Sequence, residues 1–141
     1  MSRQHLIWIG WVLVCAWMCL PVDAQLSAKQ QRGIDKLVAE CQAGKQKSCA
    51  KLGKMAKTNK SAAVRKAATE KVTDPVMLAG IALGDLDDGV RQEAVGSLQD
   101  QAMLADVARK SAHGPLRLQA AQKLTDPVLS AELVKSSSDS Q

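Results

Sequence analysis

The stretch 61–86, "SAAVRKAATEKVTDPVMLAGIALGDL", decides the fold because its pattern returns twice more without a gap. The copies that follow are 87–112, "DDGVRQEAVGSLQDQAMLADVARKSA", and 113–138, "HGPLRLQAAQKLTDPVLSAELVKSSS", so the period is 26 residues. A repeat in this length range is typical of a solenoid, in which each unit buries its apolar face against its neighbours. Three such units are therefore predicted over 61–138.

Each copy carries two apolar stripes at helical spacing. In its first half, small or aliphatic residues recur every four positions, which places them on one face of a helix: Val64, Ala68 and Val72, then Val90, Ala94 and Leu98, then Leu116, Ala120 and Leu124. In its second half, aliphatic residues such as Leu78 and Ile81 recur with helical spacing as well. Two helices of about ten residues each fit one copy, so the fold class is predicted to be all-α.

An aspartate recurs at the break between the two helices of every copy, at Asp74, Asp100 and Asp126, and proline follows it at Pro75 and Pro127. Aspartate at an N-cap accepts the free N–H groups of the first turn, and proline is tolerated at the first helical position. These three residues are predicted to be structural caps. Carboxylates one repeat apart are also too distant for paired acid–base catalysis.

An arginine recurs near the start of each first helix, at Arg65, Arg91 and Arg117. We expect its guanidinium to bond the terminal carbonyls of the preceding unit's second helix, or a turn carboxylate such as Asp85. The three arginines would then form a structural ladder along the stack. An anion-binding stripe is the alternative interpretation.

This combination of aliphatic-Arg, Ala, aliphatic, Asp-Pro and paired aliphatic residues resembles HEAT-type repeats, in the short form found in phycobilisome-lyase-like families. The resemblance covers 61–138 and matches position by position in all three copies. It implies a right-handed α-solenoid of short helical hairpins that serves as a protein-binding scaffold. Nothing in the residues indicates a bilin lyase specifically.

The first 24 residues have the layout of a cleaved signal peptide. Arg3 precedes an apolar run, Pro21 ends it, and Ala24 occupies the position before the expected cleavage. An uncleaved membrane anchor is the alternative, although the run is shorter than the ~20 residues a spanning helix needs. The protein is thus expected to be exported, to the periplasm or the medium. All three tryptophans lie in this segment, so the remaining core must be aliphatic.

Residues 25–60 are predicted to form a basic helical hairpin closed by a disulfide between Cys41 and Cys49. Export favours a structural disulfide, because disulfides persist in oxidising compartments. The C-x7-C spacing also differs from the C-x-x-C of redox pairs, and two cysteines are too few ligands for a metal site. Closing so short a loop would stabilise the fold by about 2.5 kcal/mol. The stretch resembles the cysteine-bridged form of Sel1-like repeats, with matches at Cys41, Gly44, Cys49, Leu52 and Gly53.

Charge divides the chain at residue 60. Residues 25–60 contain nine Lys or Arg and two acidic residues, a net charge of +7, whereas 61–141 contain nine against eleven, a net charge of −2. The basic segment could dock on anionic lipid, a wall polymer or an acidic protein, or be only a solvated face. Nucleic acid is not an expected partner, because export argues against it and no aromatic residue remains to stack on bases.

The positions that differ between copies are the candidates for partner contacts, in particular Asp106, Arg109, Glu132 and Lys135 on the second helices; an idle solvated face is the alternative. No enzyme is expected, because the one histidine of 25–141, His113, lies in a turn without an obvious partner. No cofactor, metal or small-molecule substrate is implied.

The predicted function is therefore to bind or scaffold a protein partner in the cell envelope, and the residues do not specify which partner. Two alternatives remain: an envelope-surface module that binds lipid or polymer through 25–60, and an accessory chaperone or assembly factor for an exported enzyme. The polar tail, 139–141, is expected to be disordered.

Overall fold

The computed structural model describes residues 26–138, and all of the regular structure in this range is helical. The signal peptide predicted for 1–24 and the tail predicted for 139–141 lie outside the described residues. The eight helices of the described range are α2 (Ala28–Gln42), α3 (Gln46–Thr58), α4 (Ala62–Thr69), α5 (Pro75–Gly84), α6 (Asp88–Ser97), α7 (Gln101–Lys110), α8 (Gly114–Gln122) and α9 (Pro127–Ser138). The all-α prediction is confirmed.

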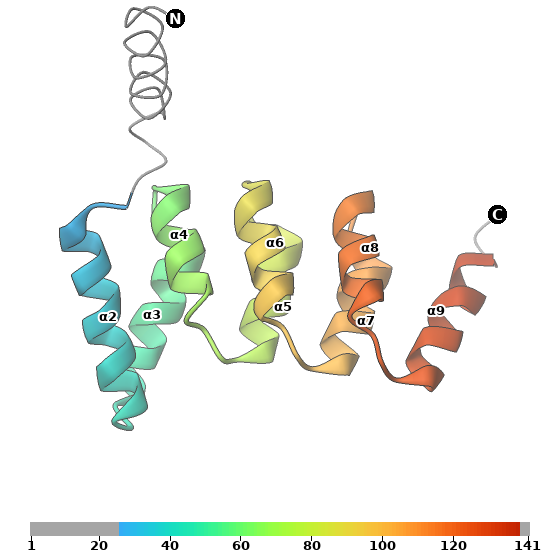
Figure 1. Ribbon diagram of the computed structural model, residues 1–141, viewed down its shortest axis with the longest axis horizontal. Coiled ribbons are helices and arrows are strands. Elements are labelled where there is room, and N and C mark those ends of the chain that lie inside the picture. The colour runs from blue at the N-terminus through green and yellow to red at the C-terminus, as the bar shows by residue number, and fades with distance from the viewer. Residues whose placement is uncertain (1–25, 139–141) are drawn as a thin grey trace, which may run out of the picture.

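The helices lie side by side in a row that runs from α2 to α9 (Figure 1). Helices α2, α4, α6 and α8 contact one another in sequence and form one layer, while α3, α5, α7 and α9 form the second. Helices of the two layers also pack against each other, as α3 does on α4 and α5 on α6. The loops that enter α5, α7 and α9 lie along one edge of the row, and the turns that enter α4, α6 and α8 lie along the other (Figure 1).

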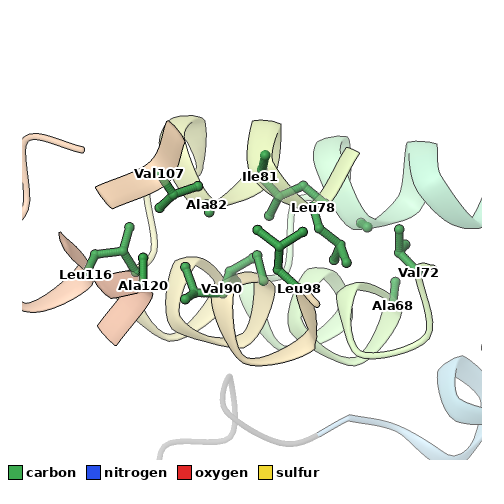
Figure 2. Packing of buried hydrophobic residues seen from close by; sticks show 14 of the residues in the cluster. Ala68, Val72, Leu78, Ile81, Ala82, Val90, Leu98, Val107, Leu116 and Ala120 are labelled. Atoms are coloured by element: carbon green, nitrogen blue, oxygen red, sulfur yellow. The ribbon is translucent and has the colours of Figure 1, made fainter. Parts of the chain in front are cut away.

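The apolar stripes of the repeat form the core between the two layers (Figure 2). In the first two copies every residue of the first-helix stripe is buried, and in the third Leu116 and Ala120 are buried while Leu124 is half-buried. The second helices bury Leu78 and Ile81 of α5 and the equivalent Leu104 and Val107 of α7. Apart from Thr69, the largest fully buried side chains of 26–138 are thus aliphatic.

The three repeated aspartates precede the second helices and accept hydrogen bonds from their first turns. Asp74 Oδ1 accepts from the N–H groups of Val76 and Met77, at 2.9 and 3.0 Å. Asp100 accepts from Met103, at 2.9 Å, and Asp126 from Val128, at 2.8 Å. These carboxylates are therefore engaged in starting α5, α7 and α9.

The helix pair α2–α3 occupies the place of a further unit in the row. Helix α3 contacts α4 and α5, just as α5 contacts α6 and α7. Leu52 and Ala56, which are both buried, stand 26 residues before Leu78 and Ala82 of α5. The 26-residue spacing of Leu52 and Ala56 from their equivalents in α5 is the signal in the sequence that indicates this relation.

Candidate partner-binding face

Each turn that enters α4, α6 or α8 is built around one polar side chain. Asn59, Asp85 and Ser111 stand 26 residues apart at the ends of α3, α5 and α7. Their side chains accept the N–H two residues further on, at 3.0, 2.9 and 3.2 Å. Three dissimilar residues thus perform one task, because each offers a short side-chain acceptor. The equal spacing could have revealed them in the sequence.

The arginine ladder lies at these turns. The Nη1 groups of Arg65, Arg91 and Arg117 donate to the carbonyl oxygens of Asn59, Asp85 and Ser111, at 2.9, 2.6 and 3.1 Å. Each guanidinium therefore satisfies the end of the preceding second helix, where backbone carbonyls lack helical partners. This arrangement joins one unit to the next, so the three arginines make structural contacts between units.

Arg65 also reaches forward to the next turn and binds Asp85. Its Nε and Nη2 donate to the two carboxylate oxygens of Asp85 at 2.7 and 2.8 Å, and the side chains are only 13% and 4% exposed. Burial raises the pKa of Asp85, but the hydrogen bonds from Arg65 and from the Asp87 N–H, with the charges of Arg65 and Arg91, outweigh it and leave this pKa below its ordinary value. The Asp85 hydrogen bond in turn raises the pKa of Arg65.

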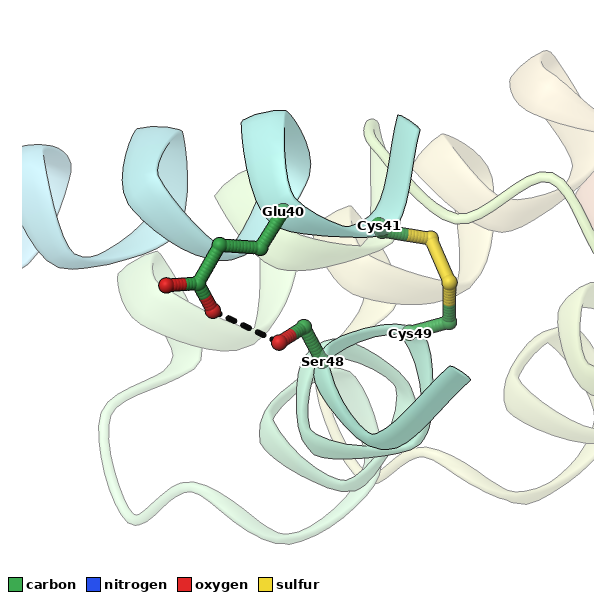
Figure 3. Close-up of a disulfide and its surroundings, with 4 residues drawn as sticks. All are labelled: Glu40, Cys41, Ser48 and Cys49. Atoms are coloured by element: carbon green, nitrogen blue, oxygen red, sulfur yellow. Dashed lines mark hydrogen bonds between the residues drawn. A yellow bond between two sulfur atoms is a disulfide. The ribbon is translucent and has the colours of Figure 1, made fainter. Parts of the chain in front are cut away.

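The disulfide between Cys41 and Cys49 closes the α2–α3 turn, with the two Cα atoms 4.8 Å apart (Figure 3). Gly44 takes a φ of +82° in this turn, which is a conformation that favours glycine. Ser48 Oγ donates to Glu40 Oε2 at 2.6 Å beside the disulfide, and this hydrogen bond lowers the pKa of Glu40. The turn is therefore fixed by a covalent bond and a charge-assisted hydrogen bond.

A groove of about 260 Å³ lies between this disulfide and the loop that enters α5. Its polar lining includes Lys71, Thr73 and Asp74, and its apolar lining includes Met77. Asp74 is already engaged as the cap of α5, and within 26–138 no three His, Cys, Asp or Glu side chains are grouped so as to hold a metal ion. The groove therefore brings together no recognisable catalytic set.

The outward side of the second layer differs from unit to unit. We call it the outer face and define it by three equivalent positions on each helix: Ala50, Lys54 and Lys57 on α3; Val76, Gly80 and Leu83 on α5; Ala102, Asp106 and Arg109 on α7; and Val128, Glu132 and Lys135 on α9. All twelve are exposed except Asp106, which is half-buried. This face contains all four residues predicted from the sequence to contact a partner, Asp106, Arg109, Glu132 and Lys135.

Three of those proposed residues also bind one another. Asp106 accepts from Lys110 Nζ at 2.8 Å and from Arg109 Nη2 at 3.3 Å, and Arg109 Nη1 lies 3.8 Å from Glu132 on the next helix. The hydrogen bond from Lys110 is the main reason that the pKa of Asp106 lies below its ordinary value. The α7–α9 part of the outer face is thus a partly self-neutralised network, and exposed pairs of this kind contribute little to stability.

The α3 part of the outer face has the opposite character. Helix α3 contains four lysines and no acidic residue. Among the residues of 26–138, no acidic group lies within ion-pairing distance of Lys54 or Lys57. The middle position of the outer face therefore changes along the row from Lys54 through Gly80 to Asp106 and Glu132, from positive through neutral to negative.

In comparisons with known proteins, no family model, no curated protein and no solved structure matches this chain. Between residues 26 and 138, no helix has the length and apolar character needed to cross a membrane.

Proposed function

We propose that this protein is an exported, HEAT-like, right-handed α-solenoid that binds another protein, or holds proteins together, in the cell envelope. The outer face carries the proposal. In this interpretation the chain has no catalytic activity of its own, and the disulfide, the aspartate caps and the arginine ladder serve the fold.

The contrast between positions that are repeated from unit to unit and positions that change supports this function. Leu78 and Leu104 are equivalent and buried, as are Ala82 and Ala108, so the interior is repeated from unit to unit. On the outer face, by contrast, the equivalent residues Lys54, Gly80 and Asp106 share neither size nor charge. A surface that varies over a repeated core is the usual arrangement of solenoids that bind other proteins along an extended face.

Site-specific photo-crosslinking in the native cell envelope tests this function. Leu83 of the outer face and Leu118 of α8, in the other layer, are both exposed leucines and provide a matched pair of positions. A photoreactive residue at position 83 should capture one defined protein, and the same residue at 118 should not. Failure to capture any protein from the outer face, or an identical set from both positions, would contradict the proposal.

Export is tested independently by the mature amino terminus. If the leader is cleaved after Ala24, mass spectrometry of the protein purified from the envelope or the medium should give a chain beginning at Gln25. Recovery of an intact chain that retains Met1, with the protein still in the cytoplasm, would contradict export.

A further inference from the structure

We propose that the part of the outer face formed by α3 and α5 binds an acidic, amphipathic segment of the partner protein. This inference rests on the proposed function and adds the chemistry of the partner. The residues concerned are Lys54 and Lys57 on α3 and Val76, Gly80 and Leu83 on α5, which we call the lysine–glycine patch.

Gly80 is the first observation, because the fold itself does not require glycine there. It is exposed in the middle of α5, and a Cβ built on it would meet Lys57 Nζ at 3.6 Å, an ordinary contact. Gly53 differs, since a Cβ there would collide with the side chain of Met77. An alanine at position 80 would fit and would favour the helix. A bare backbone at an exposed helical position allows another chain to approach closely.

The surroundings of Gly80 indicate what would approach. Val76 and Leu83 are 68% and 40% exposed on the same side of α5, so they offer aliphatic surface at either end of the glycine. Lys57 extends from α3 towards Gly80, and Lys54 lies one turn earlier. Neither lysine has an acidic partner within 26–138, as described above. The complementary ligand has small or aliphatic side chains for α5 and carboxylates for α3.

The charge of the rest of the outer face favours a narrow protein segment over an anionic membrane. A flat anionic surface that reached Lys54 and Lys57 would also extend over Asp106 and Glu132, which share the outer face on α7 and α9. On the same two helices Arg109 and Lys135 balance these carboxylates, so this part of the outer face has no net positive charge to attract an anionic membrane. A segment that lies along α3 and α5 alone would meet only the basic and apolar part.

Binding of short labelled peptides to the full mature chain tests the inference. The probe is an amphipathic peptide with glutamates along one edge and alanine and leucine along the other, and its matched control replaces every glutamate by glutamine. Fluorescence anisotropy should show binding of the acidic peptide that is at least tenfold tighter than that of the control. The affinity should fall when salt is raised from about 0.05 to about 0.3 M, because the lysines are exposed.

Two variants locate the binding site. Lys54→Glu with Lys57→Glu, and separately Gly80→Gln, should each weaken binding of the acidic peptide about tenfold or more. Gly80→Gln should also raise Tm, because glutamine favours a helix more than glycine does, so a loss of binding cannot be attributed to unfolding. Lys29→Glu with Lys36→Glu on α2 changes the charge equally and should leave the affinity within about twofold.

Three results would overturn the inference: no preference for the acidic peptide, an equal loss in the α2 control, or binding to phosphatidylglycerol vesicles that depends on the same residues and replaces peptide binding. The proposed function is judged separately. If position 83 crosslinks to a defined protein but the acidic peptide does not bind, then protein binding stands and the acidic partner is wrong.

Discussion

Single residues at the turns join one unit of the row to the next, and Asp85 makes the most hydrogen bonds of this kind. Its carboxylate binds the Arg65 guanidinium through both oxygens and accepts the Asp87 N–H, while its carbonyl oxygen accepts from Arg91. Asn59 and Ser111, at the equivalent positions, lack the charge. The second turn of the ladder is therefore the one held by a buried ion pair, and its loss should be costly.

Replacing this carboxylate should destabilise the protein measurably. Asp85→Asn retains the shape but leaves the Arg65 guanidinium without its charged partner, and we expect a loss of about 2–3 kcal/mol in the free energy of unfolding. Urea denaturation followed by circular dichroism measures it. Glu70→Gln is the matched control, because Glu70 and its ion-pair partner Lys71 are both exposed; its cost should stay below about 0.5 kcal/mol. Equal costs would contradict the assigned role.

The same carboxylate should make stability depend on pH in acid. Because the folded pKa of Asp85 lies below the ordinary value, its contribution is complete above the ordinary aspartate value of about 3.9 and declines as the pH falls through the folded pKa. The difference in unfolding free energy between wild type and Asp85→Asn should be constant from about pH 7 to about pH 5 and should narrow below about pH 4. A difference that widened towards acid would contradict this sign.

At the scale of the elements, one helix start departs from the repeat. Gln101 stands where Pro75 and Pro127 begin α5 and α9. Its Oε1 accepts the N–H groups of Thr125 and Asp126, at 2.7 and 3.3 Å, and therefore holds the loop that enters α9. In the second copy this position therefore fixes the loop of the third copy. In the first and third copies the same position is a proline that starts the second helix of its own copy.

Restoring the repeat at this position should therefore weaken the protein. Gln101→Pro fits the first position of α7 but removes the amide, so we expect a loss of about 1 kcal/mol, similar to that of Gln101→Ala. Thermal unfolding measures both variants. Gln99→Ala, in the exposed loop before α7, should change stability by less than about 0.5 kcal/mol. A Gln101→Pro variant more stable than wild type would show that the bridge contributes little.

The first element pair depends on its covalent closure. Replacing both cysteines, Cys41→Ser with Cys49→Ser, should cost about 2.5 kcal/mol under oxidising conditions, because the unfolded chain is no longer constrained. A reducing agent should lower the Tm of the wild type to a similar extent and should not affect the serine variant. Unchanged melting of the serine variant relative to the oxidised wild type would contradict a stabilising role for this disulfide.

At the scale of the whole molecule, the repeat pattern was sufficient to predict an all-α chain, because Val64, Ala68 and their equivalents have one period and one buried face. Asp74 and its equivalents could be placed because capping is local chemistry. The role of Gln101 could not, since its partners lie in the next copy and depend on how the loops meet. The neutralisation of Asp106 by Lys110 and Arg109 likewise requires side-chain positions. The glycine at position 80 became informative only when its surroundings were known.

Removal of the last unit tests how far stability is shared along the row. A chain without 113–141 loses α8 and α9, which contact α6 and α7, whereas the contacts among α2, α3, α4 and α5 remain. We expect a helical protein with a lower Tm whose amide hydrogens in α3 and α4 stay protected in hydrogen exchange, while those of α7 exchange faster. Complete unfolding of the shortened chain would contradict stability built from neighbouring contacts.

The nearest-neighbour arrangement of the helices also has a consequence for folding kinetics. The substantial contacts in 26–138 join helices no more than two apart along the chain, so every loop that must close is short and the entropy lost before contacts form is small. Proteins with such low contact order fold within microseconds to milliseconds. A chain that emerges amino terminus first can therefore complete α2 and α3 and close the Cys41–Cys49 bond. Each later helix can then pack on the helices already formed, in the order of synthesis.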